Sequence, residues 1–209
     1  MKLEQLERVT GIAAPFMRIN IDTDQIAPTR EHIRARSEGY GPGLFGEIRY
    51  RDPETREENP DFVLNKVPYR KAQILIADRN FGCGSSREGA PMHLRGFGFR
   101  AVVAPSFGGI FFNNCFRNGI APVMLPEADV HTLARQVEEK GGHTQITVDV
   151  VASKLTGPDG KVYAFTLPAF GRRMLLEGID EIEQTLTMTP EIDAYRQRDR
   201  AKRGWAWLG

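Results

Sequence analysis

The chain has 209 residues, of which 26% are charged, and its formal net charge is +1. This length suits one domain over residues 1–209, and the near-neutral charge gives no electrostatic reason to expect nucleic acid or an anionic membrane as a partner. No stretch approaches the roughly 18 apolar residues of a membrane span, and residues 1–16 lack the apolar segment of a signal peptide, so we expect a cytoplasmic protein. Cys83 and Cys115 are too few for a disulfide framework, and too few to ligate an iron–sulfur cluster or a structural zinc alone.

Residues 39–65 are rich in Gly, Pro and charge and lose apolar periodicity, which predicts a long exposed loop. Beyond this loop, short apolar runs alternate with helical patterns, in the order 73–78 (strand), 86–98 (helix), 100–105 (strand), 106–119 (helix), 121–126 (strand) and 127–142 (helix). Strands that alternate with helices favour parallel pairing in a layered α/β domain. At 144–168 two alternating runs flank Gly-Pro-Asp-Gly, which predicts an antiparallel hairpin and a mixed sheet.

Helical patterns resume at Ala169 and predict a helical C-terminal tail over residues 169–209. Thr189 is expected to cap the last helix, with Pro190 at its first position, where a missing amide proton costs nothing. The final segment places Trp205 and Trp207 close together. Two interpretations stay open for them: packing of the terminus onto the body, or contact with a partner, since Trp is enriched at interface hot spots.

The segment NFGCGSSREGAP, residues 80–91, follows a predicted strand and leads into a predicted helix, whose first amides favour an anion. One interpretation is structural, because Ser85-x-x-Glu88 matches a capping box. The other is functional, because a cap needs one Ser, whereas Ser86 and Arg87 crowd the same helix start. Arg87 in a first turn opposes the helix dipole, and its planar guanidinium pairs bidentately with a carboxylate or a phosphate.

Several familiar motifs are absent from this segment. A dinucleotide fingerprint would require Gly where Arg87 stands, the Walker pattern lacks its Lys, and the hydrolase pattern G-x-S-x-G is not met at Ser85 or Ser86. A stand-alone serine hydrolase or phosphate binder is therefore disfavoured. A hydrolase also needs a His, and no His pairs in the sequence with either Ser. Each is expected on a surface or a helix face: His32, His93, His131 and His143.

Four motifs carry a resemblance that covers nearly the whole chain in the same order. They are NIDTDQIAP at 20–28, NPDFVLN at 59–65, NFGCGSSRE at 80–88 and APSFGGIFFNNCFRNGIAPV at 104–123. The chain resembles the small subunit of the 3-isopropylmalate dehydratases, the leucine-pathway isomerases of the aconitase superfamily. The resemblance implies an α/β fold, the three-layer β/β/α swivelling domain equivalent to the last domain of aconitase. It also implies a separate large subunit that carries a [4Fe–4S] cluster, in a heterodimer or heterotetramer, with no metal bound by this chain.

The resemblance further implies roles for residues of two motifs. Ser85 is implied to be the base that removes a proton from the substrate carbon, and Ser86 and Arg87 to bind a substrate carboxylate and help stabilise the alkoxide. Asp24 is implied to orient a His of the large subunit, whereas Cys83 has no assigned role. The iron of the partner acts as a Lewis acid on the substrate hydroxyl in this scheme. 2-Isopropylmalate is thereby dehydrated to isopropylmaleate and rehydrated to 3-isopropylmalate.

Two positions depart from the family pattern. Gly89 stands where the family reads His after S-S-R-E, and Gly in a first helical turn weakens it by roughly 1 kcal/mol relative to Ala. The family's substrate-selecting segment, an aromatic residue followed by Leu, reads Glu31, His32, Ile33 and Arg34 here. A charged wall suits a branched alkyl group poorly, so a smaller or more polar malate, such as dimethylmalate or citramalate, stays open as the substrate. It also stays open that the segment turns outward and selects nothing, or that the chain is a non-catalytic carboxylate-binding paralogue.

Overall fold

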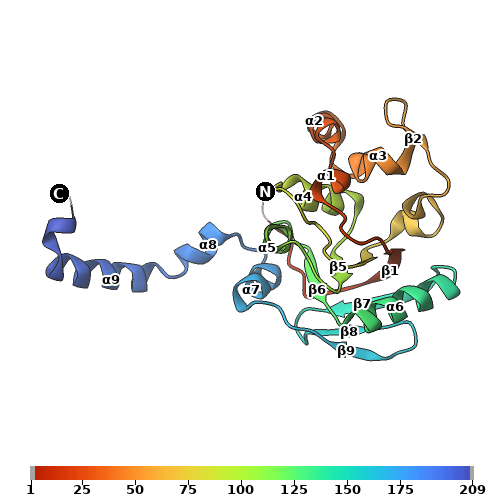
Figure 1. Cartoon of the computed structure of the whole chain (residues 1–209). Helices are drawn as coiled ribbons and strands as arrows, with labels where there is room; N and C mark the ends of the chain where they lie inside the picture. The colour runs from red at the N-terminus through yellow and green to blue at the C-terminus, as the bar shows by residue number, and fades with distance from the viewer. Residues whose placement is uncertain (1–2, 208–209) are drawn as a thin grey trace.

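The computed structural model describes residues 3–207, and its centre is one curled, mixed sheet (Figure 1). The strands of this sheet are β1 (Arg8–Phe16), β4 (Ile74–Ala77), β5 (Ala101–Ala104), β6 (Ala121–Met124), β7 (Gln145–Asp149), β8 (Lys154–Thr156) and β9 (Val162–Ala164). Within the described range the seven strands lie in the order β6-β5-β4-β1-β7-β8-β9. Pairing is parallel from β6 to β1 and antiparallel from β1 to β9.

Strand β1 joins the two halves of the sheet. Its residues 13–16 pair in parallel with β4, whereas residues 8–12 pair antiparallel with β7. Strand β1 thus connects the parallel and antiparallel halves of one curled sheet, and helices pack against this sheet. The sequence did not reveal β1, because Gly11 and the residues Ala13, Ala14 and Pro15 have weak strand propensities, and the extended state here comes from neighbours on both sides.

The alternation of strands and helices that the sequence predicted is confirmed. The helices of this region are α4 (Gly89–Phe97), α5 (Gly109–Arg117) and α6 (Glu127–Glu139). Every residue of β4 and β5 is buried, as expected for strands of a parallel sheet that is covered on both faces. Helix α6 packs on β1, β4 and β5, and α5 packs on β6 and α4.

The predicted hairpin is the turn between β8 and β9. The Gly157 N–H donates to the Lys161 carbonyl at 2.8 Å, and the Asp159 carboxylate accepts the Lys161 N–H at 2.9 Å. Strand β7 adds antiparallel to β8, so the segment forms a three-stranded meander that extends the sheet.

The segment 39–65 differs from the exposed loop that the sequence predicted. It contains 3₁₀ turns at Gly41–Gly43 and Val63–Asn65, helix α3 (Gly46–Arg49), and the antiparallel pair β2 (Tyr50–Asp52) and β3 (Glu57–Glu58). Phe45, Phe62 and Leu64 are buried, and the rings of Phe45 and Phe62 lie 4.9 and 5.5 Å from the ring of Phe16. Most of its exposed residues lie around β2 and β3. Few apolar side chains anchor the segment, and they follow no regular period, so its Gly, Pro and charge content hid their burial.

The remaining N-terminal elements are α1 (Thr23–Ile26), α2 (Thr29–Glu38) and a 3₁₀ turn at Tyr69–Lys71 that leads into β4. Helix α1 begins within the NIDTD motif, α2 begins at Thr29, and both flank α4 on one side of the sheet (Figure 1). They carry the segments that the sequence analysis singled out.

The C-terminal helices are α7 (Ala169–Glu177), α8 (Glu181–Leu186) and α9 (Thr189–Lys202), followed by a 3₁₀ turn at Gly204–Ala206. Helix α7 packs on α5, whereas α8 and α9 extend away from the sheet (Figure 1), and α9 has no buried residue. Thr189 is the first residue of α9 rather than its N-cap, which is Met188. The Thr189 hydroxyl donates back to the Leu186 carbonyl at 2.6 Å and so does not cap an amide of the helix.

The two tryptophans do not pack onto the body of the protein. Trp207 donates its Nε1–H to Asp199 of α9 at 3.0 Å, and the guanidinium of Arg200 lies 5.2 Å from the Trp207 ring. Trp205 is 83% exposed, while Leu208 and Gly209 lie outside the described residues. Contact with a partner stays a prediction for this tail. Within residues 3–207, no helix combines the length and the apolar character needed to cross a membrane.

Candidate active site

The NFGCGSSRE loop lies beside the NIDTD segment. The Gly82 N–H donates to the Ile21 carbonyl at 2.7 Å, and the Thr23 N–H donates to the Cys83 carbonyl at 2.9 Å. Asp22 is opposite Cys83 in a short parallel bridge. Two motifs that are far apart in the sequence therefore share one backbone hydrogen-bond pattern and form one site at the end of β4.

The motif at residues 104–123 packs against this loop and supports it. The Gly108 N–H, at the start of α5, donates to the Phe81 carbonyl at 2.9 Å. Gly82 has a φ of +71°, and a Cβ at this position would lie 2.1 Å from Cγ of Phe111. Only glycine combines this left-handed backbone with the close approach of an aromatic ring. Helix α5 thus fixes the course of the loop that carries Ser85.

Ser85 is exposed at the tip of the loop, and its Oγ lies 3.3 Å from Oγ1 of Thr23. The predicted capping box is wrong. Helix α4 begins at Gly89, and its N-cap Glu88 has helical φ and ψ and makes no side-chain cap. Gly84 at φ +98° turns the chain before Ser85, whose carbonyl accepts the Arg87 N–H at 2.8 Å. Ser85 therefore lies one turn ahead of the helix and keeps its hydroxyl exposed.

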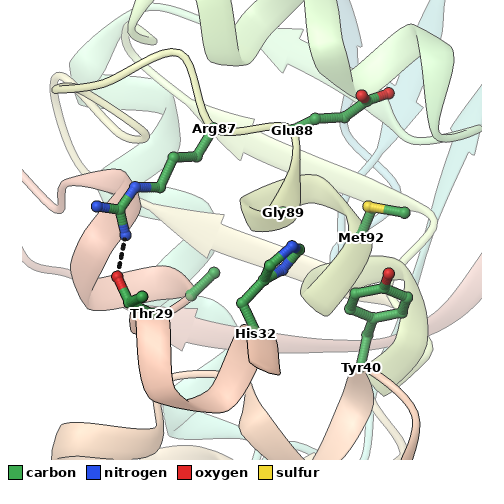
Figure 2. A pocket seen from close by; sticks show the side chains of 8 residues that line it. Thr29, His32, Tyr40, Arg87, Glu88, Gly89 and Met92 are labelled. Carbon is green, nitrogen blue, oxygen red and sulfur yellow. Dashed lines mark hydrogen bonds between the residues drawn. The ribbon is translucent and has the colours of Figure 1, made fainter. Parts of the chain in front are cut away.

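Arg87 and Asp24 form an ion pair between the two motifs. Nη1 of Arg87 also donates to Oγ1 of Thr29 at 2.9 Å, and Figure 2 shows this bond. Arg87 lies ahead of Gly89, where α4 begins, and is therefore outside the first turn of the helix, contrary to the prediction. The side chains of Arg87 and Asp24 are 40% and 57% exposed, so both remain open to exchange with a ligand or a partner.

Ser86 is exposed between Ser85 and Arg87, and it adds a second hydroxyl to the same surface. The two cysteines have different environments, since Cys83 is partly exposed in the loop, whereas Cys115 of α5 is buried. Burial raises the pKa of the Cys115 thiol well above its usual range, so this thiol stays protonated and unreactive. Neither cysteine has a second thiol beside it in the described chain.

A cavity of about 410 Å³ opens next to Arg87. Its lining consists of Ala27, Thr29, His32, Tyr40, Arg87, Glu88, Gly89 and Met92 (Figure 2). The apolar side chains of Met92 and Tyr40 line one part, and the polar groups of Arg87, Thr29 and His32 line another. The arrangement suits a small anion with an apolar substituent.

The predicted selectivity segment divides into separate environments. Glu31, expected to line the substrate site, is instead buried, and its carboxylate lies 2.8 Å from Arg56 and 3.3 Å from Arg34. Ile33 is 64% exposed on the outer side of α2. Of the four residues, only His32 lines the cavity.

Two glycines make room for the buried carboxylate. A Cβ at Gly43 or at Gly46 would lie 2.7 Å from a carbon of the Glu31 side chain. The sequence analysis treated Glu31 as an unpaired charge, but the arginines that neutralise it come from α2 and from the β2–β3 segment. Arg34 lies three residues from Glu31 on α2, whereas the pairing with the distant Arg56 leaves no signal in the local sequence.

The other three histidines differ in their exposure to solvent. His131 and His143 are exposed, as predicted, and Nε2 of His131 lies 3.2 Å from Asp78. His93 lies on the buried face of α4, and its Nδ1 lies 2.8 Å from the Gly89 carbonyl. Burial lowers the pKa of His93.

Sequence reasoning did not single out Thr23 and Thr29, which contact Ser85 and Arg87. Thr23 belongs to the quoted NIDTD motif, and Thr29 follows it closely. Their hydroxyls become relevant only because the two loops meet.

Comparison with known proteins agrees with this geometry. The chain matches the Aconitase C-terminal domain family over residues 3–128. It is 45% identical to the 3-isopropylmalate dehydratase small subunit of Hahella chejuensis, over 99% of each chain. The corresponding subunit of Rhodospirillum centenum is 47% identical, over 98% of this chain and 99% of that relative. The chain belongs to the 3-isopropylmalate dehydratase small-subunit family.

A solved structure points to the same family fold. The crystal structure of 3-isopropylmalate dehydratase from Methanocaldococcus jannaschii aligns with a TM-score of 0.62, over 90% of this chain and 99% of that chain. Since the two sequences are 21% identical, this likeness concerns the fold alone. The family resemblance and the α/β fold that the sequence predicted are therefore confirmed.

Proposed function

We propose that this chain is the small subunit of a hydro-lyase that isomerises 2-isopropylmalate to 3-isopropylmalate through isopropylmaleate, and that it acts with a large subunit in the cytoplasm. The observation that carries the proposal is the meeting of Asp24, Ser85 and Arg87 on one exposed surface, although they come from two distant motifs. The names of the relatives, 3-isopropylmalate dehydratase small subunit, supply the reaction.

Ser85 is the proposed base. A serine hydroxyl is a weak base, so its alkoxide form needs donors that lower the cost of the charge. Thr23 Oγ1, at 3.3 Å, can donate to Ser85 Oγ, and the cation of Arg87 follows two residues later. Thr23 is buried and holds a fixed position. The exposed Ser85 oxygen, in its alkoxide form, then accepts a proton from the substrate carbon presented by the partner and becomes a neutral hydroxyl.

Arg87 binds a substrate carboxylate in this proposal, with Ser86 as a second donor. The Arg87–Asp24 pair is largely exposed, and such pairs contribute roughly 0–1 kcal/mol. A substrate carboxylate that makes two parallel hydrogen bonds to the guanidinium replaces the Asp24 contact at little cost. Asp24 is then released to orient a histidine of the large subunit.

The iron–sulfur cluster belongs to the large subunit in this proposal. A [4Fe–4S] cluster is held by about four thiolates, whereas this chain has two cysteines, one of them buried. The cluster supplies a Lewis acid for the substrate hydroxyl. The residues of this chain provide the proton acceptor and the carboxylate site.

The test is reconstitution under anaerobic conditions. This chain is mixed with its cluster-bearing large subunit, and the absorbance of the unsaturated acid is followed with 2-isopropylmalate. We expect turnover that requires both chains, is lost in Ser85→Ala, and persists in Ser37→Ala, an exposed serine of α2 outside the cavity. Absence of turnover with the cluster intact and the chains associated would contradict the proposal and favour the non-catalytic paralogue.

A second candidate substrate is favoured by one observation. His32 lines the cavity where the family pattern has Leu, and a polar ring is a poorer wall for a branched alkyl group. Turnover of citramalate or dimethylmalate well above that of 2-isopropylmalate would assign the chain to a related dehydratase. A clear preference for 2-isopropylmalate would exclude this second candidate.

A further inference from the structure

Gly89 and His32 touch each other in the cavity beside Arg87. Gly89 is the buried first residue of α4, and a Cβ built on it would lie 2.8 Å from Nδ1 and 3.1 Å from Cε1 of His32. The imidazole therefore rests directly on the glycine (Figure 2). Any side chain at position 89 would displace it. The space left by the missing side chain of α4 is filled from α2.

The direction of His32 is fixed by its neighbours. Glu31 is buried among arginines. Because successive residues of a helix are rotated by about 100°, the next residue, His32, lies on the face of α2 that meets α4. The rings of Tyr40 and His93 each lie 5.8 Å from the His32 ring. The imidazole is thus held by packing, while its side chain stays exposed to the cavity.

Hydrogen-bond donors converge on this corner of the cavity. They are the guanidinium of Arg87 and an imidazole N–H of His32, and both residues line the cavity. Among the hydrogen bonds within residues 3–207, none uses a ring nitrogen of His32. The acidic groups nearby are Asp24, which is paired with Arg87, and the exposed Glu88. Donors on two sides of one cavity suit a molecule with two carboxylates.

We propose that His32 is a substrate-binding residue: it donates a hydrogen bond to one carboxylate of the hydroxydicarboxylate, while Arg87 pairs with the other, and Gly89 admits the imidazole to this position. Neutral and charged imidazole both carry an N–H that can make this bond. The inference rests on the proposed function for the identity of the substrate. It assigns His32 to the carboxylate shared by all malate derivatives rather than to the alkyl substituent.

Steady-state kinetics of the reconstituted pair test the inference with 2-isopropylmalate and citramalate, which share both carboxylates and differ in the alkyl group. His32→Leu removes the donor, and Gly89→Ala pushes the ring aside from the other helix. We expect each variant to raise KM about tenfold for both acids, with kcat changed by less than about threefold. His32→Gln keeps an N–H donor and should recover most of the loss.

The double variant and a control make the test specific. His32→Leu combined with Gly89→Ala should lose no more than either single variant, because both remove the same contact. His143→Leu changes an exposed histidine outside the cavity and should leave KM unaltered. A KM increase for 2-isopropylmalate alone would contradict the inference, since it would mean that His32 contacts the alkyl group.

Equilibrium dialysis gives a readout without turnover. Labelled 2-isopropylmalate is bound to the pair that carries Ser85→Ala, with and without His32→Leu, and we expect Kd to rise about tenfold. If the wild-type pair turns over neither acid, the proposed function fails, and the dialysis still decides the role of His32. An unchanged Kd, or no binding at all, would overturn the inference.

Discussion

Glu31 is expected to be a structural anchor, although its sequence position suggested contact with substrate. Its side chain is fully buried, and its carboxylate lies 2.8 Å from Arg56, 3.3 Å from Arg34 and 3.8 Å from Arg30. Removing one partner of a buried ion pair costs about 3–5 kcal/mol. The arginine side chains here are 22–37% exposed, so the lower end of that range, about 3 kcal/mol, is expected for Glu31→Gln.

Urea unfolding measures this loss as a lower midpoint at unchanged slope. For a chain of this size, about 3 kcal/mol corresponds to a fall in Tm of roughly 6–12 °C. Glu54→Gln is the matched control, because Glu54 pairs with Arg30 and Arg34 but is 63% exposed, and its loss should stay below about 1 kcal/mol. Equal losses in the two variants would refute the reasoning that burial sets the cost.

Two further predictions concern the support of the site. Gly82→Ala should lower the free energy of unfolding by about 2–4 kcal/mol, because a Cβ meets the Phe111 ring at 2.1 Å and φ is +71°. Gly160→Ala, at φ +82° with no atom within 4 Å of the added Cβ, should lose only about 1 kcal/mol; similar losses in unfolding experiments would contradict the steric argument. For His93, burial lowers the pKa from the ordinary 6.5, so the unfolded chain binds a proton that the folded chain does not. The contribution of neutral His93 to the free energy of unfolding should be complete above pH 6.5. It should fall by up to about 1.4 kcal/mol per pH unit as the pH drops from there toward the lowered pKa. The His93→Gln variant should lack this pH dependence in the same unfolding series. A variant with the same pH profile as the wild-type protein would refute the role of His93.

The family and the general fold could be predicted from the sequence because their signals are local. The strands around Ile74 and Ala101 are continuous apolar runs of strand length, and helices with their own periodicity separate them. The hairpin follows from the chemistry of the Gly-Pro-Asp-Gly turn. The motifs that hold Asp24, Ser85 and Arg87 are likewise contiguous in sequence. Each of these features needs only neighbours along the chain.

Features that depend on distant partners were missed or misread. Strand β1 has a weak local propensity and is extended because β4 and β7 pair with it. Ser85 and Glu88 match a capping box, but the backbone bonds from Gly82 to Ile21 and from Thr23 to Cys83 hold the loop against the NIDTD segment, and the helix starts later.

In the selectivity segment, local sequence and tertiary contacts each determined a different property of two adjacent residues. The sequence determined that Glu31 and His32 are polar where the family pattern is apolar. Tertiary structure decided that the carboxylate is buried against arginines while the imidazole reaches the cavity over Gly89. The reason is physical: the cost of burying the Glu31 charge depends in part on Arg56, which is distant in the sequence, and the room for the His32 ring depends on a side chain that another helix lacks.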